Sequence, residues 1–299
     1  AAYCCHAGQS NTNESRLQAL EVYIDPAMEW AKTLLAEHPA NKQLGDAALK
    51  LALNSAYAYD EGHGNSPDSL RRSLDRYSDP AMAWASELMA EFPTDTNLGG
   101  SALQLARNAA VNCHEGQSNL SDSRLQSLQR YSDPAMAWAK TLMAEHPTDP
   151  KLGVEALKLA HNAEINCKRG MGDTVEAHRV AVERYGLPAM TWLPVLQAAH
   201  PLNREIGEGA LKVAYSASND YVKQNDTTVA QLEALHHFAL PVAERASAVE
   251  PLVETALGIP GLGWNMQLWA EGPGLVDTRT FCALLTSKWV LAKGRNEKG

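Results

Sequence analysis

The side chains in this sequence best suited to chemistry are two adjacent cysteine and histidine pairs. Cys5-His6 and Cys113-His114 each place a thiol next to an imidazole. Such groups can bind zinc together, or act as a nucleophile and its general base. The pairs would mark a metal site or an active site if the fold brought them together.

A 54-residue repeat decides where these pairs can lie. Six series of residues return at this interval: Tyr23, Tyr77, Tyr131 and Tyr185; Pro26, Pro80, Pro134 and Pro188; Met28, Met82, Met136 and Met190; Trp30, Trp84, Trp138 and Trp192; Gly45, Gly99, Gly153 and Gly207; Gly8, Gly62, Gly116 and Gly170. The two pairs occupy one position of this repeat, two copies apart. Because packed helices are about 8–10 Å apart in each layer, the pairs cannot share one ion. We interpret the cysteines as small apolar side chains and the histidines as cations favoured at helix C-termini.

The first two helices of each copy are expected to meet at an aspartate-proline pair. In the third copy the first helix covers about residues 123–131, with Leu125 and Leu128 facing inward. An aspartate side chain can cap a helix whose first turn holds proline. Asp25, Asp79 and Asp133 are predicted to do so, and Leu187 replaces them in the fourth copy.

The third helix of each copy is the longest and the most apolar. Its predicted N-caps are Asn41, Asp95, Asp149 and Asn203. Its buried face in the second copy is predicted to contain Leu98, Ala102, Leu105 and Ala106. It is expected to end at Gly62, Gly116 or Gly170, in the left-handed conformation that glycine adopts at least cost.

Three short helices bury too little surface alone, so neighbouring copies must cover each other's apolar faces. The sequence therefore predicts an all-α fold, an α-solenoid of three-helix repeats with a C-terminal helical cap. We assign 1–8 to the end of an upstream repeat, 9–62, 63–116 and 117–170 to three repeats, 171–245 to divergent repeats and 246–299 to the cap. A separate small domain is the alternative for 246–299. Residues 1–8 match the end of a third helix, so we expect further copies upstream.

Composition and charge argue against several classes of function. The chain has 299 residues and a formal net charge of −9, which disfavours binding to nucleic acid. No apolar run reaches the length of a membrane span. Five cysteines without disulfide-framework spacing indicate reduced thiols, and hence a cytoplasmic protein or one acting in the cytosol of a host cell. Cys282 could act as a catalytic cysteine if the fold brought His236 and His237 close to it. No sequence motif supports that role. We expect no catalytic, cofactor-binding or metal-binding residues.

Several further residues of the repeat could either contact a partner or be buried in the core. The tryptophan series is interpreted as core between copies, against the alternative of an aromatic cage. Asn54, Asn108 and Asn162 share one position of the third helix. They could form a hydrogen-bond ladder, which we favour, or contact a bound peptide. Gln9 and Gln117 lie in the loop before the first helix, where partner contacts are common.

The interpretation we favour is a protein or peptide-binding scaffold, a fragment of a larger protein. Near-identical copies supply the same residues along a line, whereas catalysis needs different residues at one point. An acidic chain suits a basic partner. The alternatives are a recruiting arm or C-terminal part of an enzyme, which includes a bacterial effector, and a structural spacer. Loss of an activity on mutation of His236, His237 or Cys282 would favour the enzyme.

Overall fold

The structure is a computed structural model that describes residues 12–201, 203–225 and 238. All regular secondary structure in these residues is helical, as the sequence predicts. The chain divides into two compact units, unit 1 (Ala1–His146) and unit 2 (Pro147–Gly299).

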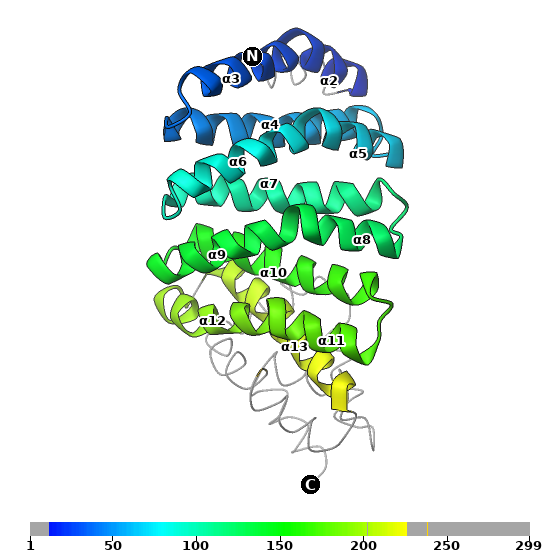
Figure 1. Ribbon diagram of the computed structural model, residues 1–299, viewed down its shortest axis with the longest axis vertical. Helices are drawn as coiled ribbons and strands as arrows, with labels where there is room; N and C mark the ends of the chain where they lie inside the picture. The colour runs from blue at the N-terminus through cyan, green and yellow to red at the C-terminus, as the bar shows by residue number, and fades with distance from the viewer. Residues whose placement is uncertain (1–11, 202, 226–237, 239–299) are drawn as a thin grey trace. The chain divides into compact units, whose positions relative to one another are not determined.

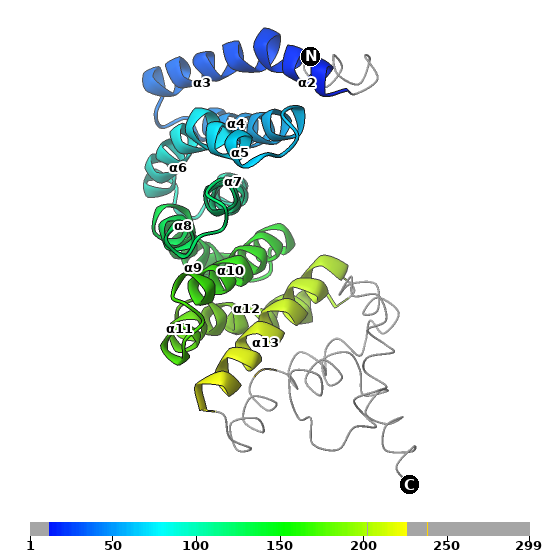
Figure 2. The ribbon, with the colours of Figure 1, turned by 90° about the vertical axis from the view of Figure 1, so that its right-hand side faces the viewer.

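Unit 1 consists of helices in two layers. Its elements are α2 (Asn13–Ala19), η1 (Leu20–Ile24), α3 (Asp25–Glu37), α4 (Lys42–Gly62), α5 (Pro67–Ser73), η2 (Leu74–Ser78), α6 (Asp79–Glu91), α7 (Thr96–Glu115), α8 (Ser121–Ser127), η3 (Leu128–Ser132) and α9 (Asp133–Glu145), where η is one turn of π-helix. The long helices α4 and α7 pack side by side, and α5 and α6 lie against them (Figure 1). In Figure 2, α6 and α8 lie in the layer to the left of α7.

Unit 2 has the same kinds of element. They are α10 (Pro150–Gly170), α11 (Val175–Ala181), η4 (Val182–Gly186), α12 (Leu187–Ala199) and α13 (Arg204–Asn225). The long helices α10 and α13 pack together, and α11 contacts both of them. The region where α10, α11 and α13 meet is the joint of unit 2.

The first two helices of each copy are continuous, which corrects the three-helix interpretation. The aspartate at each junction has helical backbone angles and makes no cap: the angles at Asp25 are φ −59 and ψ −47. A turn of π-helix precedes it each time. Proline inside an α-helix loses a hydrogen bond and clashes with the preceding turn, and a wider π-turn relieves both problems. Each sequence copy thus contains one bent helix and one long helix.

The junction aspartates instead join one copy to the next within unit 1. The Tyr77 hydroxyl donates to Asp25 Oδ1 at 2.7 Å, and Arg76 pairs with the same carboxylate. The Tyr131 hydroxyl donates to Asp79 Oδ1 at 2.6 Å. Tyr77 and Tyr131 are buried, so this bond satisfies a hydroxyl that has left water.

The caps of the long helices confirm the sequence prediction. Asn41 accepts from Leu44 N at 3.0 Å, and Asn203 accepts from Ile206 N at 3.1 Å. Asp95 and Asp149 cap α7 and α10 in the same way. The predicted face of α7 is also correct, since Leu98, Ala102, Leu105 and Ala106 are fully buried.

The glycines at the ends of the long helices serve packing rather than a left-handed turn. Gly116 has φ −62, and the left-handed residues of that loop are Ser118 and Asn119. A Cβ at Gly116 would lie 3.1 Å from the backbone nitrogen of Arg71 on α5. The second glycine series also allows close packing, because a Cβ at Gly99 would lie 2.5 Å from Leu142 Cδ1.

The tryptophans are not the core that the sequence suggested. Trp30 is 70% exposed, and Trp84, Trp138 and Trp192 are half-buried. Trp84 packs over a cluster of smaller buried side chains that includes Leu35. Alanine, leucine and methionine side chains make up most of the core, together with the buried tyrosines Tyr77, Tyr131 and Tyr185. Leu128 is buried as predicted, whereas Leu125 is exposed.

Candidate functional site

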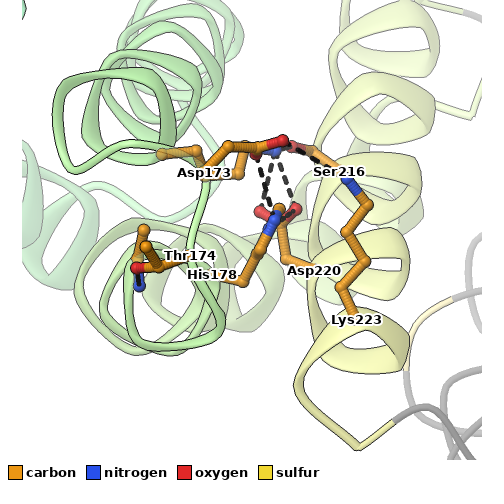
Figure 3. Close-up of polar contacts among 8 residues, drawn as sticks. Asp173, Thr174, His178, Ser216, Asp220 and Lys223 are labelled. Atoms are coloured by element: carbon orange, nitrogen blue, oxygen red, sulfur yellow. Dashed lines mark hydrogen bonds and ion pairs between the residues drawn. The ribbon is translucent and has the colours of Figure 1, made fainter. Parts of the chain in front are cut away.

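A cluster of buried charged side chains lies where α10, α11 and α13 meet in unit 2. Figure 3 shows His178 of α11 next to Asp220 of α13, with Asp173 of the turn before α11 beside them. Lys168 Nζ of α10 lies 2.8 Å from both oxygens of Asp220. His178 Nδ1 of α11 lies 2.9 Å from Asp220 Oδ1. Asp220 has no exposed surface, so its carboxylate depends on these neighbours rather than on water.

The turn before α11 positions Asp173, the outermost residue of the cluster. Gly172 and Asp173 have φ of 77 and 55, the left-handed conformation that glycine and aspartate tolerate best. Thr174 then caps α11 by accepting from Ala177 N at 3.1 Å. This geometry sets Asp173 Oδ1 3.1 Å from His178 Nε2. The His178 ring is thereby held between two carboxylates.

Glu164 is the second fully buried carboxyl group of the joint. Burial raises its pKa well above the ordinary value, and the neighbouring Asp220 charge raises it further. Both of its carboxyl oxygens are buried without a hydrogen-bond partner among the described residues. A charged carboxylate in this position would be uncompensated, so the surroundings favour the neutral form of Glu164.

Two neighbours of Glu164 define its surroundings. A Cβ at Gly186 of η4 would lie 3.3 Å from Glu164 Oε1, so glycine leaves room for the carboxyl group. His161 lies one turn earlier on α10, and burial together with the positive charges of Lys168 and Lys212 lowers its pKa to about 4. His161 is therefore neutral at physiological pH.

The cluster has acid and base groups but no access for a substrate. The side chains of Glu164, His178 and Asp220 are almost completely buried, and that of Lys168 is 12% exposed. Carboxyl groups with strongly shifted pKa values are typical of functional sites. In the described part of the chain, no group of three histidine, cysteine, aspartate or glutamate residues could hold a metal ion. The cluster is therefore a buried polar feature of the interior of unit 2.

The sequence analysis missed this cluster, although the repeat contains a signal for it. Glu164 replaces the alanines at 56 and 110, and Lys168 replaces Asp60 and His114. His178, Gly186 and Asp220 also depart from their earlier counterparts, which are Leu70 and Arg124, Ser78 and Ser132, and Asn112 and Asn166. Each departure looks unremarkable alone. Their gathering in three dimensions is visible only in the structure.

The corresponding joint of unit 1 is simpler. Asn112 Nδ2 of α7 donates to Asp60 Oδ2 of α4 at 2.9 Å and lies 3.2 Å from Ser73 Oγ. Burial raises the Asp60 pKa to about 6, against the hydrogen bonds from Ser73 and Asn112, which lower it. One carboxylate with two neutral hydrogen-bond partners thus takes the place of the several ionisable groups of unit 2.

The residues predicted to contact a partner lie in different environments. Asn54 is exposed on α4, Asn108 is buried in α7 and Asn162 is half-buried in α10. Gln117 is half-buried, and its Nε2 donates to Gln126 Oε1 at 3.0 Å. Gln9 lies outside the described residues. Their predicted role in binding therefore stays a prediction.

The cysteine and histidine pairs are only partly within the described chain. Cys113 is buried in α7, and burial raises its pKa to about 11, so it is a thiol rather than a reactive thiolate. His114 lies in the last turn of α7, where its Nδ1 is 2.6 Å from Asn119 Oδ1. Cys5 and His6, like Cys282, His236 and His237, lie outside the described residues.

Comparisons with known proteins add no assignment. No family model matches the chain, and neither the curated proteins nor the solved structures gave a match. Among the helices of the described residues, none has both the length and the apolar character needed to cross a membrane.

Proposed function

We propose that this chain is a segment of an α-solenoid that binds a protein partner. The observation that carries the proposal is an apolar surface on η1 and α3, formed by Val22, Tyr23, Trp30 and Leu34. These side chains are 52%, 42%, 70% and 41% exposed. Clustered apolar side chains on a protein surface are typical of protein interaction sites, and tryptophan and tyrosine are enriched among the residues that contribute most to binding.

The counterparts of this surface in the next copy support the proposal. Tyr77 is 1% exposed and donates to Asp25, and Leu88 packs against Gly45, whose Cβ would lie 2.6 Å from Leu88 Cδ1. The same side chains are thus interfacial where a neighbouring helix pair is present. On η1 and α3 the same positions carry exposed side chains.

A solenoid accounts for the recurrence of these contacts. The Leu142–Gly99 contact in unit 1 and the Leu196–Gly153 contact in unit 2 have the same geometry, with Cβ distances of 2.5 Å. Stacked helical repeats bury such contacts along the array and commonly present an extended binding surface. On that surface, exposed Asn54 would lie one turn from exposed Tyr57 on α4.

The test measures binding of a partner to the surface on η1 and α3. Proteins retained by the full chain would be identified and purified, and their affinity measured by calorimetry. The double variant Trp30→Ala and Leu34→Asp should weaken binding at least about tenfold, because each removes exposed apolar contact area. The matched control Glu29→Gln and Glu37→Gln changes exposed residues of the same helix and should leave affinity within about twofold. Equal affinity of the two double variants would overturn the proposal for this surface.

A further inference from the structure

The bent helix formed by η1 and α3 carries two apolar stripes, and only one of them is covered. The inner stripe is buried against α4 and consists of Ile24, Met28, Ala31 and Leu35. The outer stripe lies one residue earlier at each position and consists of Tyr23, Ala27, Trp30 and Leu34. Its three large side chains are exposed. Among the described helices of unit 1, α3 lies at one end, with α4 on one side of it (Figure 1).

The outer stripe recurs in the next two copies, where unit 1 buries it. Its counterparts are Tyr77, Ala81, Trp84 and Leu88 in the second copy and Tyr131, Ala135, Trp138 and Leu142 in the third. The tyrosines, alanines and leucines of both sets are buried, and the tryptophans are half-buried. The cover is the long helix of the preceding copy, because α6 packs against α4 as well as α7, and α9 packs against α7. The outer stripe of α3 thus has the side chains of a helix interface.

The first feature that the cover supplies is a carboxylate. Asp25 accepts from the Tyr77 hydroxyl at 2.7 Å, and Asp79 accepts from the Tyr131 hydroxyl at 2.6 Å. A tyrosine hydroxyl that leaves water needs such an acceptor. An occupant that covers the outer stripe of α3 must therefore offer an acceptor to the Tyr23 hydroxyl.

The second feature is a glycine on the long helix. A Cβ at Gly45 would lie 2.6 Å from Leu88 Cδ1, and a Cβ at Gly99 would lie 2.5 Å from Leu142 Cδ1. Each leucine thus fills space that any larger residue on the long helix would occupy. An occupant must have glycine opposite Leu34, or the leucine would hold the two helices apart.

The third feature is a small apolar residue near that glycine. Trp84 packs on a cluster of side chains that includes Ala48 of α4. Residues three apart on a helix share a face, so this alanine and Gly45 lie together. The same pattern occurs on each long helix, as Leu44-Gly45-x-x-Ala48, Leu98-Gly99-x-x-Ala102 and Leu152-Gly153-x-x-Ala156. A helix with the sequence Leu-Gly-x-x-Ala therefore fits the outer stripe.

We propose that the outer stripe of η1 and α3 binds a helix pair of this same repeat type in a partner protein. The long helix of the partner carries Leu-Gly-x-x-Ala, and its bent helix supplies a carboxylate to Tyr23. The inference rests on the proposed function, because it names the class of protein that the surface on η1 and α3 binds.

A second copy of this chain is a poorer fit than such a partner. Gly45, Gly99 and Gly153 are each already in contact with a leucine of the same chain. Gly207 of α13 remains, but its copy has Leu187 at the position of the junction aspartate, and leucine offers no acceptor to the Tyr23 hydroxyl.

Val22 departs from the internal interfaces and provides a way to strengthen the contact. Its counterparts Arg76 and Arg130 pair with Asp25 and Asp79, the carboxylates that also accept from the tyrosines. The carboxylate of a partner would be held at this position by the Tyr23 hydroxyl without a cation from this chain. Val22→Arg should therefore favour docking.

An added copy of the chain's own repeat serves as the probe. Residues 63–116, which contain Asp79 and Gly99, would be duplicated and placed before residue 9 of the full chain, in place of residues 1–8, so that the spacing of the repeat is kept. Tethering holds the probe at a high local concentration next to the outer stripe.

Hydrogen exchange and hydroxyl-radical footprinting would measure whether the added copy docks. Exchange of α3 amides should slow at least about tenfold relative to the original chain, because a helix covered on both sides opens less readily. The oxidation rate of the Trp30 side chain should fall to that of Trp84. Unchanged exchange of α3 together with unchanged oxidation of Trp30 would overturn the inference.

Three variants of the extended chain serve as matched comparisons. Gly99→Leu in the added copy alone fills the space for Leu34 and should return α3 exchange to the rate of the original chain. Asp79→Ala in the added copy alone should reduce the protection severalfold, because it removes the acceptor for Tyr23. Val22→Arg should add about two- to fivefold protection, as expected for one partly exposed ion pair. Full protection of α3 with Gly99→Leu would contradict the assigned geometry.

The outcomes for this inference and for the proposed function are distinct. If a purified partner loses affinity on mutation of Trp30 and Leu34 while the added copy leaves α3 exchange unchanged, only this inference fails. If the added copy protects α3 but no partner depends on Trp30 and Leu34, the proposed function fails and the complementarity of the outer stripe stands. Sedimentation of the original chain provides a further test. A dimer abolished by Leu34→Asp would assign the outer stripe to a second copy and overturn the inference.

Discussion

The joint between α4 and α7 in unit 1 and the joint between α10 and α13 in unit 2 use the same helix positions with different charge. In unit 1, Asp60 is paired with the amide of Asn112. In unit 2, the corresponding positions hold Lys168 and Asp220, an ion pair buried among further ionisable groups. Lys168 stands at the position of Asp60, and Asp220 stands at the position of Asn112. The carboxylate therefore lies on the other helix, and its partner is a cation instead of a neutral amide.

This difference changes how the stability of each joint responds to mutation and to pH. A neutral donor such as Asn112 can be removed at moderate cost, because the remaining Asp60 carboxylate can take up a proton. Removing one member of a buried ion pair leaves a charge with no partner. The comparison teaches that one scaffold can hold a tolerant joint and a sensitive one without any change in helix packing.

The largest effect is expected from Asp220→Ala, which leaves Lys168 buried opposite a missing carboxylate. It should destabilise the contact of α13 with α10 by about 3–5 kcal/mol. The unit 1 counterpart, Asn112→Ala, should cost only about 1–2 kcal/mol, since it removes one hydrogen bond. Hydrogen exchange at pH 7 would measure both losses locally, in α10 and in α4. Equal losses would remove the distinction between the two joints.

The next effect is the pH dependence of unit 1. The pKa of Asp60 is raised from 3.8 to about 6, so folding favours its protonated form. The contribution of Asp60 to the stability of unit 1 should therefore be greatest below about pH 4. It should fall by about 2–3 kcal/mol as the pH rises through 6. Asp60→Asn should abolish this fall, because the amide does not titrate.

Protection of α4 and α7 amides at pH 4.5 and 7 would show the change. The control is Asp75→Asn, which alters an exposed aspartate of η2 and should leave the pH profile as it is. A profile in Asp60→Asn that still falls between these pH values would assign the dependence to another group.

A third prediction concerns a packing contact that occurs in both units, between α7 and α9 in unit 1 and between α10 and α12 in unit 2. Gly99→Ala and Gly153→Ala would each bring a Cβ to 2.5 Å from a leucine methyl, of Leu142 or Leu196. Both should cost about 1–2 kcal/mol, because the leucine end can shift only partly. Adding Leu142→Ala to Gly99→Ala should relieve the clash, so the two losses would not add. A large difference between the two glycines would show that the two units differ in helix packing and not only in charge.

Much of the fold could be predicted from the sequence, because helix caps and apolar spacing act locally. Asn41 and Asp95 cap the long helices where the sequence places them, and the buried face of α7 follows its apolar spacing. The error at Asp25 and Asp79 has a physical cause. A proline after aspartate fits the start of a helix, but it also fits the turn after a π-bulge, and only the tertiary contact with tyrosine distinguishes the two.

The candidate site could not be predicted in the same way, because its members are far apart in sequence. Glu164, His178 and Asp220 come from three helices, and no local motif joins them. Trp30 shows a different limit. A large apolar residue at a helical interval fits a core and also an exposed interface, and the 54-residue spacing is the same for both.

The smallest expected loss of stability comes from replacing one of two tyrosines that occupy the same position of the repeat. Tyr131 is buried, and its hydroxyl donates to Asp79 at 2.6 Å, whereas Tyr23 is 42% exposed. Tyr131→Phe should destabilise the helices around η3 by about 1–2 kcal/mol, since it removes a hydrogen bond to a carboxylate. Tyr23→Phe should change local stability by less than about 0.5 kcal/mol, because water already solvates that hydroxyl. If hydrogen exchange showed equal losses for both, the Tyr23 hydroxyl would have a buried acceptor, and the surface on η1 and α3 would not be free for a partner.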